Sequence, residues 1–354
     1  MRRFLALSGV VALAALAVAG GEGSEHKTVT VKKSTVTHVS AHGADIAFRP
    51  IPVQYSRSLL CSIRRSERLD KWLEEIVNLS LDSVHTMNKE DVSVSYIELC
   101  PEDGCAPALG QVQGDEMFYP SGVARLFYAA ALYNKLGSHG GNLSPQMKND
   151  IMLALRDGSN SATNRLIGYL ADSRGPEYTN WYLSNLGFKN FNVNQPFITG
   201  DPTEDQHRSL GRKLNLNYEN SNRVTADQAA TLLYLLDKDA LVSPGASQAM
   251  KAYMFHPLEQ RKLGPLEGIA AGLPVGSTII TINGYTGRNY NEAALVKLSN
   301  GKRFILSINT KYNQYPTYFI PLVSRTIAFR LMTSTGQEDP GQHRYIPTLA
   351  GATH

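Results

Sequence analysis

Apolar residues three to four positions apart predict a block of helices in the middle of the chain and one helix at each end. The segment "SERLDKWLEEIVNLSL" has this spacing, which is typical of an amphipathic helix with one buried face. Further helices are expected over 121–136, 144–156, 161–172, about 176–187 and 225–237, and over "YFIPLVSRTIAFRLMTS".

Alternation of apolar and polar residues predicts strands on both sides of the helical block. "VSVSYIEL", a turn and "QVQGDEMFYP" are expected to form a β-hairpin, and three strands are expected in "GSTIITINGYTG" and "NEAALVKLSNGKRFILSINT". Asn300-Gly301 is a strong hairpin turn signal. This order of elements favours an α+β fold, with one antiparallel sheet built from both ends of the domain and an inserted all-helical half.

The two ends of the chain lack this periodicity. Arg2-Arg3, the apolar run "FLALSGVVALAALAVAG" and the sequence Ala17-Val18-Ala19 predict a secretory signal peptide cut after about Ala19. A membrane anchor is the alternative, but the run is short for a membrane span. We therefore expect a signal peptide over 1–19, a polar linker over 20–57, a domain over 58–335 and a flexible tail over 336–354. The protein is expected to be secreted or periplasmic, with no membrane span after cleavage.

Composition narrows the function classes only a little. Of the 354 residues 42% are hydrophobic and 19% are charged, as in ordinary globular proteins. The net charge is +4, and the 35 Lys and Arg residues are scattered rather than clustered, which argues against nucleic-acid binding.

The chain has three cysteines. Cys100 and Cys105 flank the turn-rich "CPEDGC", and in an oxidising compartment they are expected to form a disulfide. Cys61 is expected to be a buried thiol rather than a nucleophile. Neither a metal site nor a cofactor is expected, because no His or further Cys stands at ligand spacing from these residues.

Three segments carry the candidate chemistry. "YPSGVARLFYAAALY" begins tightly at Tyr119-Pro120 and continues as an Ala-rich helix, "GSNSATNRLIGYL" opens a later helix, and "INGYTGRNYNEAALV" spans two strands. With the order of elements, these segments resemble the serine β-lactamase and penicillin-binding-protein family, in its class A-like form, over about residues 62–335. The resemblance implies a β-lactamase-like (DD-peptidase) fold and a serine hydrolase site made of S-x-x-K, S-D-N and K-T-G motifs.

The first two motifs lack their reactive residues. Gly122 and Arg125 stand at the serine and lysine positions of S-x-x-K. Glycine has no nucleophile, and arginine, whose pKa is above ~12, cannot serve as the base. S-D-N is replaced by Gly158-Ser159-Asn160, where Ser159 and Asn160 also suit an ordinary helix N-cap.

The other two motifs are degenerate in the same way. Tyr285 stands at the lysine position of K-T-G, followed by the expected Thr286 and Gly287. The family's Glu-x-x-Leu-Asn loop aligns with "GRKLN", which has Gly211 in place of glutamate. Other carboxylates nearby in the sequence are Glu204, Asp205 and Glu219.

These replacements favour a catalytically impaired protein whose cleft binds a ligand or a partner. Glycines at former catalytic positions are expected to widen the cleft. The ligand contacts are expected from Arg125, Asn160, Tyr285, Thr286 and Gly287. The resemblance suggests a β-lactam-like or peptidoglycan-derived small molecule, Arg125 suiting its carboxylate, or a cell-envelope protein. We expect a monomer.

Two alternatives remain open at this level. One is a divergent serine hydrolase that acts on β-lactams or cell-wall peptides through Ser121 or Ser159, with His139 or His207 as a base if the fold brings either close. The other is an unrelated exported binding domain. Arg125, if buried, is expected to have a partner, such as an acidic residue on a neighbouring helix.

Overall fold

The computed structural model describes residues 51–85, 87–99, 106–138, 143–171, 177–197, 222–256, 258, 268–286, 289–311 and 316–333. The expected signal peptide, most of the expected linker, the tail from Gly336 and the two cysteines of the expected disulfide lie outside these ranges. Within them, no helix is both long and apolar enough to cross a membrane.

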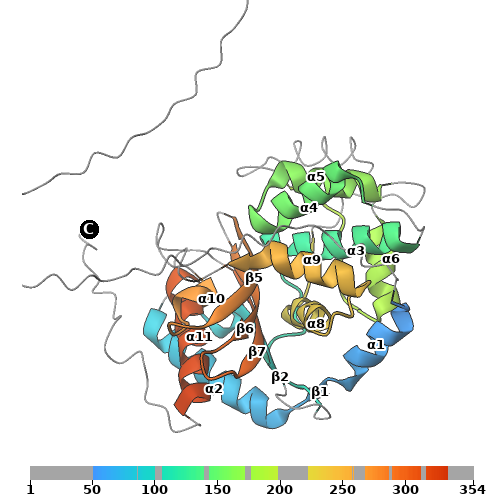
Figure 1. Cartoon of the computed structure of the whole chain (residues 1–354). Coiled ribbons are helices and arrows are strands. Elements are labelled where there is room, and N and C mark those ends of the chain that lie inside the picture. Colours follow the sequence, from blue (N-terminus) through green and yellow to red (C-terminus); the bar gives the residue numbers. More distant parts are fainter. Residues whose placement is uncertain are drawn as a thin grey trace, which may run out of the picture. The chain divides into compact units, whose positions relative to one another are not determined.

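In the described residues the strands form one seven-stranded sheet, in the order β1-β3-β2-β7-β6-β5-β4 (Figure 1). Its neighbours are antiparallel except for the parallel pair β1 and β3. The central pairing joins β2 from the first half of the domain to β7 near its end, with Val92 opposite Thr310 and Leu99 opposite Arg303. This confirms the predicted sheet built from both ends. The strands are β1 Arg64–Arg65, β2 Val92–Leu99, β3 Ala108–Val112, β4 Phe255–His256, β5 Thr278–Thr286, β6 Asn289–Lys297 and β7 Arg303–Thr310.

Helices cover both faces of the sheet (Figure 1). One face packs against α2 (Glu67–Val84), α10 (Gly268–Ala271) and α11 (Pro316–Thr333). The other face packs against α8 (Ala226–Asp237), behind which the helical half of the domain lies. The remaining helices are α1 Val53–Ser62, η1 Lys89–Asp91, η2 Ser121–Val123, α3 Ala124–Ser138, α4 Pro145–Arg156, α5 Asn160–Leu170, α6 Glu177–Leu186 and α9 Pro244–Met254.

Both faces of the central strands are buried, so each strand supplies side chains to two hydrophobic cores. Val94 and Tyr96 of β2 belong to the core with α2 and α11, whereas Ile97 and Leu99 belong to the core with the helical half. Burial on both sides explains why these strands are richer in apolar residues than a half-exposed sheet would require.

Side-chain caps fix where several helices begin. Ser159 accepts a hydrogen bond from the Ala162 N–H at the start of α5, which confirms the predicted N-cap. Thr225 and Gln228 form a capping box at the start of α8. Such caps satisfy N–H groups that have no partner within the helix.

The short elements β1, η1, β4 and α10 were not predicted, and the structure differs from the prediction in three further places. Helix α1 begins at Val53 inside the expected linker, because the Ile51 N–H and Ser56 Oγ donate to backbone carbonyls near the end of α8. Helix α9 was not predicted, although Ser243 and a proline at the first helical position are ordinary start signals. Strand β3 lies earlier than "QVQGDEMFYP" implies and ends at Val112, where Gln113 takes the left-handed φ of 52° and turns the chain.

Cys61 was also predicted wrongly. It lies on α1 with an exposed side chain, not a buried one. Cys61 lies on the outer face of this short helix. The contacts of α1 with the rest of the domain are made by Ser56 and by the partly buried apolar residues of α1.

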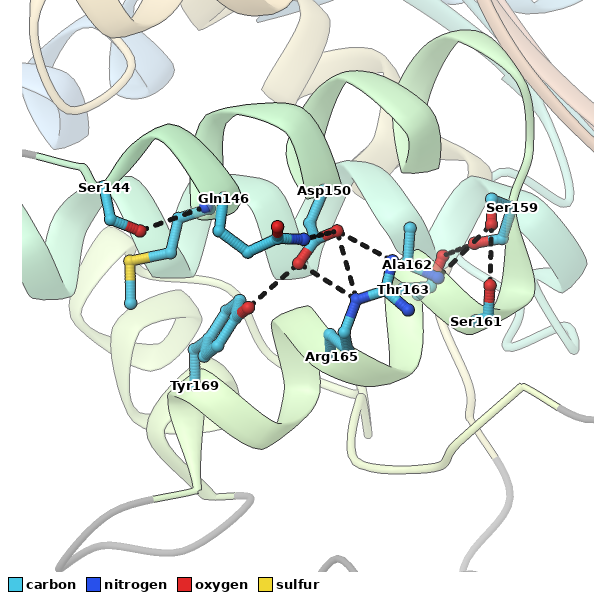
Figure 2. A network of polar contacts seen from close by, with 10 residues as sticks. Ser144, Gln146, Asp150, Ser159, Ser161, Ala162, Thr163, Arg165 and Tyr169 are labelled. Atoms are coloured by element: carbon cyan, nitrogen blue, oxygen red, sulfur yellow. Dashed lines mark hydrogen bonds and ion pairs between the residues drawn. The ribbon is translucent and has the colours of Figure 1, made fainter. Parts of the chain in front are cut away.

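A fully buried carboxylate joins α4 to α5 (Figure 2). Asp150 has 0% of its side chain exposed and accepts from the Arg165 guanidinium at 2.8 to 3.1 Å, from Tyr169 Oη at 2.9 Å and from Gln146 Nε2 at 3.0 Å. Burial alone would raise the pKa of this carboxyl, but the three donors together outweigh burial and the pKa is lowered. Asp150 is therefore a charged link between two helices of the helical half.

The carboxyl group of Asp227 has a raised pKa, whereas the pKa of Asp150 is lowered. Asp227, in the first turn of α8, accepts from Ser95 Oγ at 2.7 Å, and burial raises its pKa to about 6, with Asp115 adding to the shift. Gln111 Oε1 is buried without a hydrogen-bond partner. A Cβ built on Gly114 would lie 2.3 Å from Asp227 Oδ1 and 2.4 Å from Gln111 Oε1, so the two oxygen atoms lie near each other. A protonated Asp227 would thus have an acceptor close by.

Replacing Asp150 by asparagine should destabilise the protein by about 2 kcal/mol, because Arg165 loses its charged partner while remaining partly accessible to water. Urea unfolding at pH 7 measures this. Asp157→Asn is the matched control, since its ion pair with Arg156 is exposed and such pairs contribute less than ~1 kcal/mol. Equal losses in the two variants would contradict the role of the buried link.

Replacing Asp227 by asparagine should stabilise the protein at pH 7.5 and not at pH 4. A folded pKa of about 6 lies above the unfolded value of ~3.9, so the folded state binds more protons between these values and stability falls as pH rises. The variant escapes this loss, which amounts to about 3 kcal/mol at pH 7.5. Melting temperatures across pH 4–8 test it, and a constant difference between the two proteins would argue against a raised pKa.

Candidate functional site

The entrance to α3 is held in a strained turn by strand β6. Ser121 has the left-handed φ of 48°, which is unfavourable for a residue with a side chain. Asn291 of β6, fully buried, donates from Nδ2 to the Tyr119 carbonyl at 2.6 Å and lies 3.5 Å from Ser121 Oγ. Its Oδ1 accepts from the Thr310 N–H on β7. The sheet thereby fixes the backbone that leads into Gly122.

Gly122 lies directly against the backbone of β5. A Cβ on Gly122 would be 2.1 Å from Arg125 Nη1, 2.3 Å from the Asn283 carbonyl oxygen and 2.7 Å from Gly284 Cα. A Cβ on Gly284 would in turn be 1.7 Å from the Gly122 nitrogen. Atoms cannot approach so closely, so neither position accommodates a side chain without movement of the backbone. The expectation that glycine widens the cleft is wrong at this point, because the two backbones lie in direct contact.

Arg125 joins the three elements that meet here. Its Nη2 donates to Asn160 Oδ1 on α5 at 2.8 Å, and its Nη1 lies 3.4 Å from the Asn283 carbonyl on β5. The guanidinium carbon is 4.8 Å from the centre of the Phe197 ring, a cation–π distance. Arg125 therefore contacts the segment aligned with S-D-N, and it contacts β5 at Asn283, two residues before the segment aligned with K-T-G.

The Arg125 side chain is buried without an acidic partner among the described residues. The residue is 8% exposed, and its Nε has no hydrogen-bond partner. Burial lowers the pKa of the guanidinium to about 10, while nearby Tyr119 acts in the opposite direction, so Arg125 stays charged at neutral pH. The expected acidic residue on a neighbouring helix is replaced by neutral oxygens and an aromatic ring.

The S-D-N segment lies close to Arg125. Gly158 has the left-handed φ of +66°, and a Cβ there would lie 3.6 Å from Arg125 Nη1. Ser159 Oγ caps α5 and lies 3.1 Å from Ser161 Oγ, whereas Asn160 binds Arg125 (Figure 2 shows the two serines). Gly122, Arg125, Gly158 and Asn160 thus lie together in the structure.

Tyr285 does not join this group. Its side chain is 68% exposed, and the residues of β5 that meet Arg125 and Gly122 are Asn283 and Gly284. The contacts with β5 are thus one and two residues before the segment aligned with K-T-G. Thr286 ends β5 opposite Asn289.

Several predicted residues lie outside the described ranges. These are Gly287, Gly211, His139, His207, Glu204, Asp205 and Glu219. Among the residues that the structure does describe, His, Cys, Asp and Glu side chains form no group of three or more suited to a metal ion.

A small pocket opens beside Arg125, with a volume of about 120 Å³. Its walls come from the end of α4 and Gly158 on one side, and from β4 and β5 on the other. The pocket is smaller than the ~300–1,000 Å³ typical of sites for drug-sized ligands. It is suited to a small group or to one end of a larger ligand.

Three residues at this site escaped the sequence analysis: Phe197, Asn283 and Asn291. Asn291 had a signal, because asparagine is uncommon inside a strand and a buried one must be hydrogen-bonded. Phe197 had none, since its position beside Arg125 depends on the path of the chain between α6 and α8.

The comparisons with known proteins agree with the predicted resemblance. A family model described as the beta-lactamase enzyme family matches residues 146–330. That range includes Gly158 and Tyr285 but begins after Gly122 and Arg125. Among curated proteins, none matches the sequence.

Solved structures share the fold. A PBP-A variant, captured as an acyl-enzyme complex with penicillin G, is 19% identical, with a TM-score of 0.56 over 76% of this chain and 98% of PBP-A. TLA-1 extended-spectrum β-lactamase is 16% identical, with a TM-score of 0.56 over 74% of this chain and 99% of its own. A β-lactamase from Desulfarculus baarsii is 16% identical, with a TM-score of 0.55 over 74% and 98%. At such low identities the likeness establishes the fold and not the chemistry.

Replacing Gly122 by alanine should destabilise the protein by about 2–3 kcal/mol, because the new methyl group overlaps the β5 backbone. Gly168→Ala is the matched control: no atom lies within 4 Å of the added Cβ in α5, and alanine favours a helix by up to ~1 kcal/mol. Urea unfolding compares the two variants. An unchanged urea midpoint of unfolding for Gly122→Ala would show that the backbones of η2 and β5 can separate at little cost in stability.

Proposed function

The chain belongs to the beta-lactamase enzyme family, and on that premise we propose that it is a non-catalytic member, which binds a ligand without cleaving it. A serine hydrolase needs a nucleophile with a free path to the substrate and a base beside it. At the aligned positions this chain has Gly122, which has no reactive atom, and Arg125, whose guanidinium cannot accept a proton at neutral pH. Together they leave neither a nucleophile nor a base.

The observation that carries the proposal is the packing at Gly122. The Arg125 guanidinium and the β5 backbone occupy the space in which a nucleophilic side chain would stand. Substituting one residue would therefore not restore the machinery. In a serine protease of a different fold, removal of the nucleophile alone lowers kcat by roughly 10⁶-fold.

The hydroxyl groups of the two alternative nucleophiles, Ser121 and Ser159, make other contacts. Ser121 is 3% exposed and its Oγ lies near Asn291 Nδ2, on the side of the sheet. Ser159 Oγ accepts the capping hydrogen bond of α5. Neither hydroxyl has a histidine, lysine or carboxylate among its described hydrogen-bond partners, so these contacts argue against the divergent hydrolase.

The proposal also covers the localisation, the ligand and the oligomeric state of the protein. The signal-like N-terminus supports an exported, secreted or periplasmic protein. Arg125 supports a small molecule that carries a carboxylate, of β-lactam-like or peptidoglycan-derived type. A cell-envelope protein is the second candidate for a partner, and we propose a monomer.

Incubation with a fluorescent penicillin and a chromogenic cephalosporin tests the proposal. We expect no covalent adduct by intact mass and no hydrolysis above buffer, with an active class A β-lactamase as the positive control. Gly122→Ser, alone and with Arg125→Lys, should also stay unacylated, because the introduced side chain meets the β5 backbone.

A stoichiometric adduct on the unaltered protein would overturn the non-catalytic function. Peptide mapping would then decide the mechanism: an adduct at Ser121 or Ser159 would establish the divergent hydrolase. Folding of each variant is verified by circular dichroism, so that a lack of reaction is not confused with a lack of structure.

A further inference from the structure

The segment that leads from strand β3 to the entrance of α3 is hydrogen-bonded to the beginning of α8 at both of its ends. At one end the Gly114 carbonyl accepts from the Asp227 N–H at 3.0 Å. At the other end Phe118 and Val224 exchange two backbone hydrogen bonds of 2.9 and 3.0 Å. The residues between these two connections, 115–117, are exposed. The position of this segment therefore depends on how firmly the first turn of α8 is held.

Two acceptor oxygens meet at the first of these connections. Asp227 Oδ1 and Gln111 Oε1 lie 2.3 and 2.4 Å from the place that a Cβ on Gly114 would occupy. Ser95 Oγ donates to Asp227 Oδ1 at 2.7 Å, whereas Gln111 Oε1 has no donor among the described residues. Gln111 is only 5% exposed, so water does not replace the missing donor from the surface. A buried acceptor left in this way is costly, and it repels a neighbouring carboxylate.

The charges around Asp227 favour a proton on its carboxyl group. Burial raises the pKa of Asp227 most, and the hydrogen bond from Ser95 opposes this effect only in part. Asp115, in the exposed turn, and Asp70, on α2, raise the pKa further. Arg65 on β1 lowers it, but this guanidinium is paired with Asp70 at 3.1 Å. A protonated carboxyl can donate the hydrogen bond that Gln111 Oε1 lacks.

We propose that Asp227 and Gln111 form a proton-binding pair, which holds the segment 114–118 against α8 in acid and loosens it at neutral pH. With the proton in place, the Asp227 hydroxyl donates to Gln111 Oε1. Loss of this proton to water leaves a carboxylate beside an amide oxygen, with no hydrogen between the two. The pair is independent of the binding function proposed above, since neither residue lines the pocket beside Arg125.

The proton acts on the candidate site through the backbone that follows Phe118. The Tyr119 carbonyl is held by Asn291 at 2.6 Å, and Ser121 has the left-handed φ of 48°. Such a conformation persists only where the surrounding structure holds it. At Phe118 that support consists of the bonds with Val224 and of the Lys311 ammonium, 4.6 Å from the centre of the Phe118 ring. Loosening at Phe118 should therefore increase the mobility of the entrance to α3.

Hydrogen–deuterium exchange of the full chain, measured by mass spectrometry on peptides that cover 114–122, tests the pair. Protection factors are compared, so that the intrinsic pH dependence of exchange cancels. A pKa of about 6 in the closed segment lies above the exposed value of ~3.9, so protection is lost as pH rises through 6. Between pH 5 and pH 7.5 we expect a loss of about tenfold. Peptides from α4, which lies in the helical half, are the internal control.

Three variants assign the effect to the pair. Asp227→Asn keeps a donor beside Gln111 at every pH, because its Nδ2 replaces the acid hydroxyl, so protection should be equal at pH 5 and pH 7.5. Gln111→Glu creates two carboxyl groups that share one proton, and the loss should move upward by about one pH unit or more. Asp115→Asn is the matched control: it removes a nearby charge but no hydrogen bond of the pair, so the loss should remain and move to slightly lower pH.

Two results would overturn the proposal. Constant protection in the unaltered protein would mean that Gln111 directs its Nε2, rather than Oε1, at a charged Asp227. A loss of the same size in Asp227→Asn would assign the pH dependence to another group. Both results come from proteins expected to fold, so the test stands even if Gln111→Glu does not, and neither result bears on the penicillin assay.

Discussion

The contact between the backbones at Gly122 and Gly284 governs the chemistry of this site. With no side chain at either residue, the start of the first buried helix lies directly on strand β5. Arg125 occupies the adjoining space and reaches α5 through Asn160. Three elements that would otherwise border a cleft are thereby packed against one another, and a small pocket lies beside Arg125.

Two of the buried charged residues of the domain, Asp150 and Arg125, have different surroundings. Asp150 is enclosed by a guanidinium, a hydroxyl and an amide, so its charge is matched within the helical half (Figure 2). Arg125 is enclosed by neutral oxygens and an aromatic ring. The first arrangement is what a structural link requires. The second leaves Arg125 with no acidic partner among the described residues, which supports a ligand that carries an anionic group.

Much of the fold could be predicted from the sequence because its signals are local or periodic. Helix spacing, the cap at Ser159 and the turn at Asn300-Gly301 each involve residues close together in the chain. The site was predicted only in part. Gly122, Arg125 and Gly158 converge, but the exposed Tyr285 and the neutral surroundings of Arg125 depend on strand register and on distant segments. Cys61 shows the same limit, because its exposure depends on how α1 docks.

The reciprocal dependence of Gly122 and Gly284 also has an evolutionary consequence. A side chain at either position collides with the backbone of the other, so each glycine constrains which mutations the other can accept. A serine at 122 would therefore lower stability unless a change at Arg125 or in β5 made room for it first. The order in which such substitutions could be accepted is thus restricted by the contact between the two backbones, independently of what the protein binds.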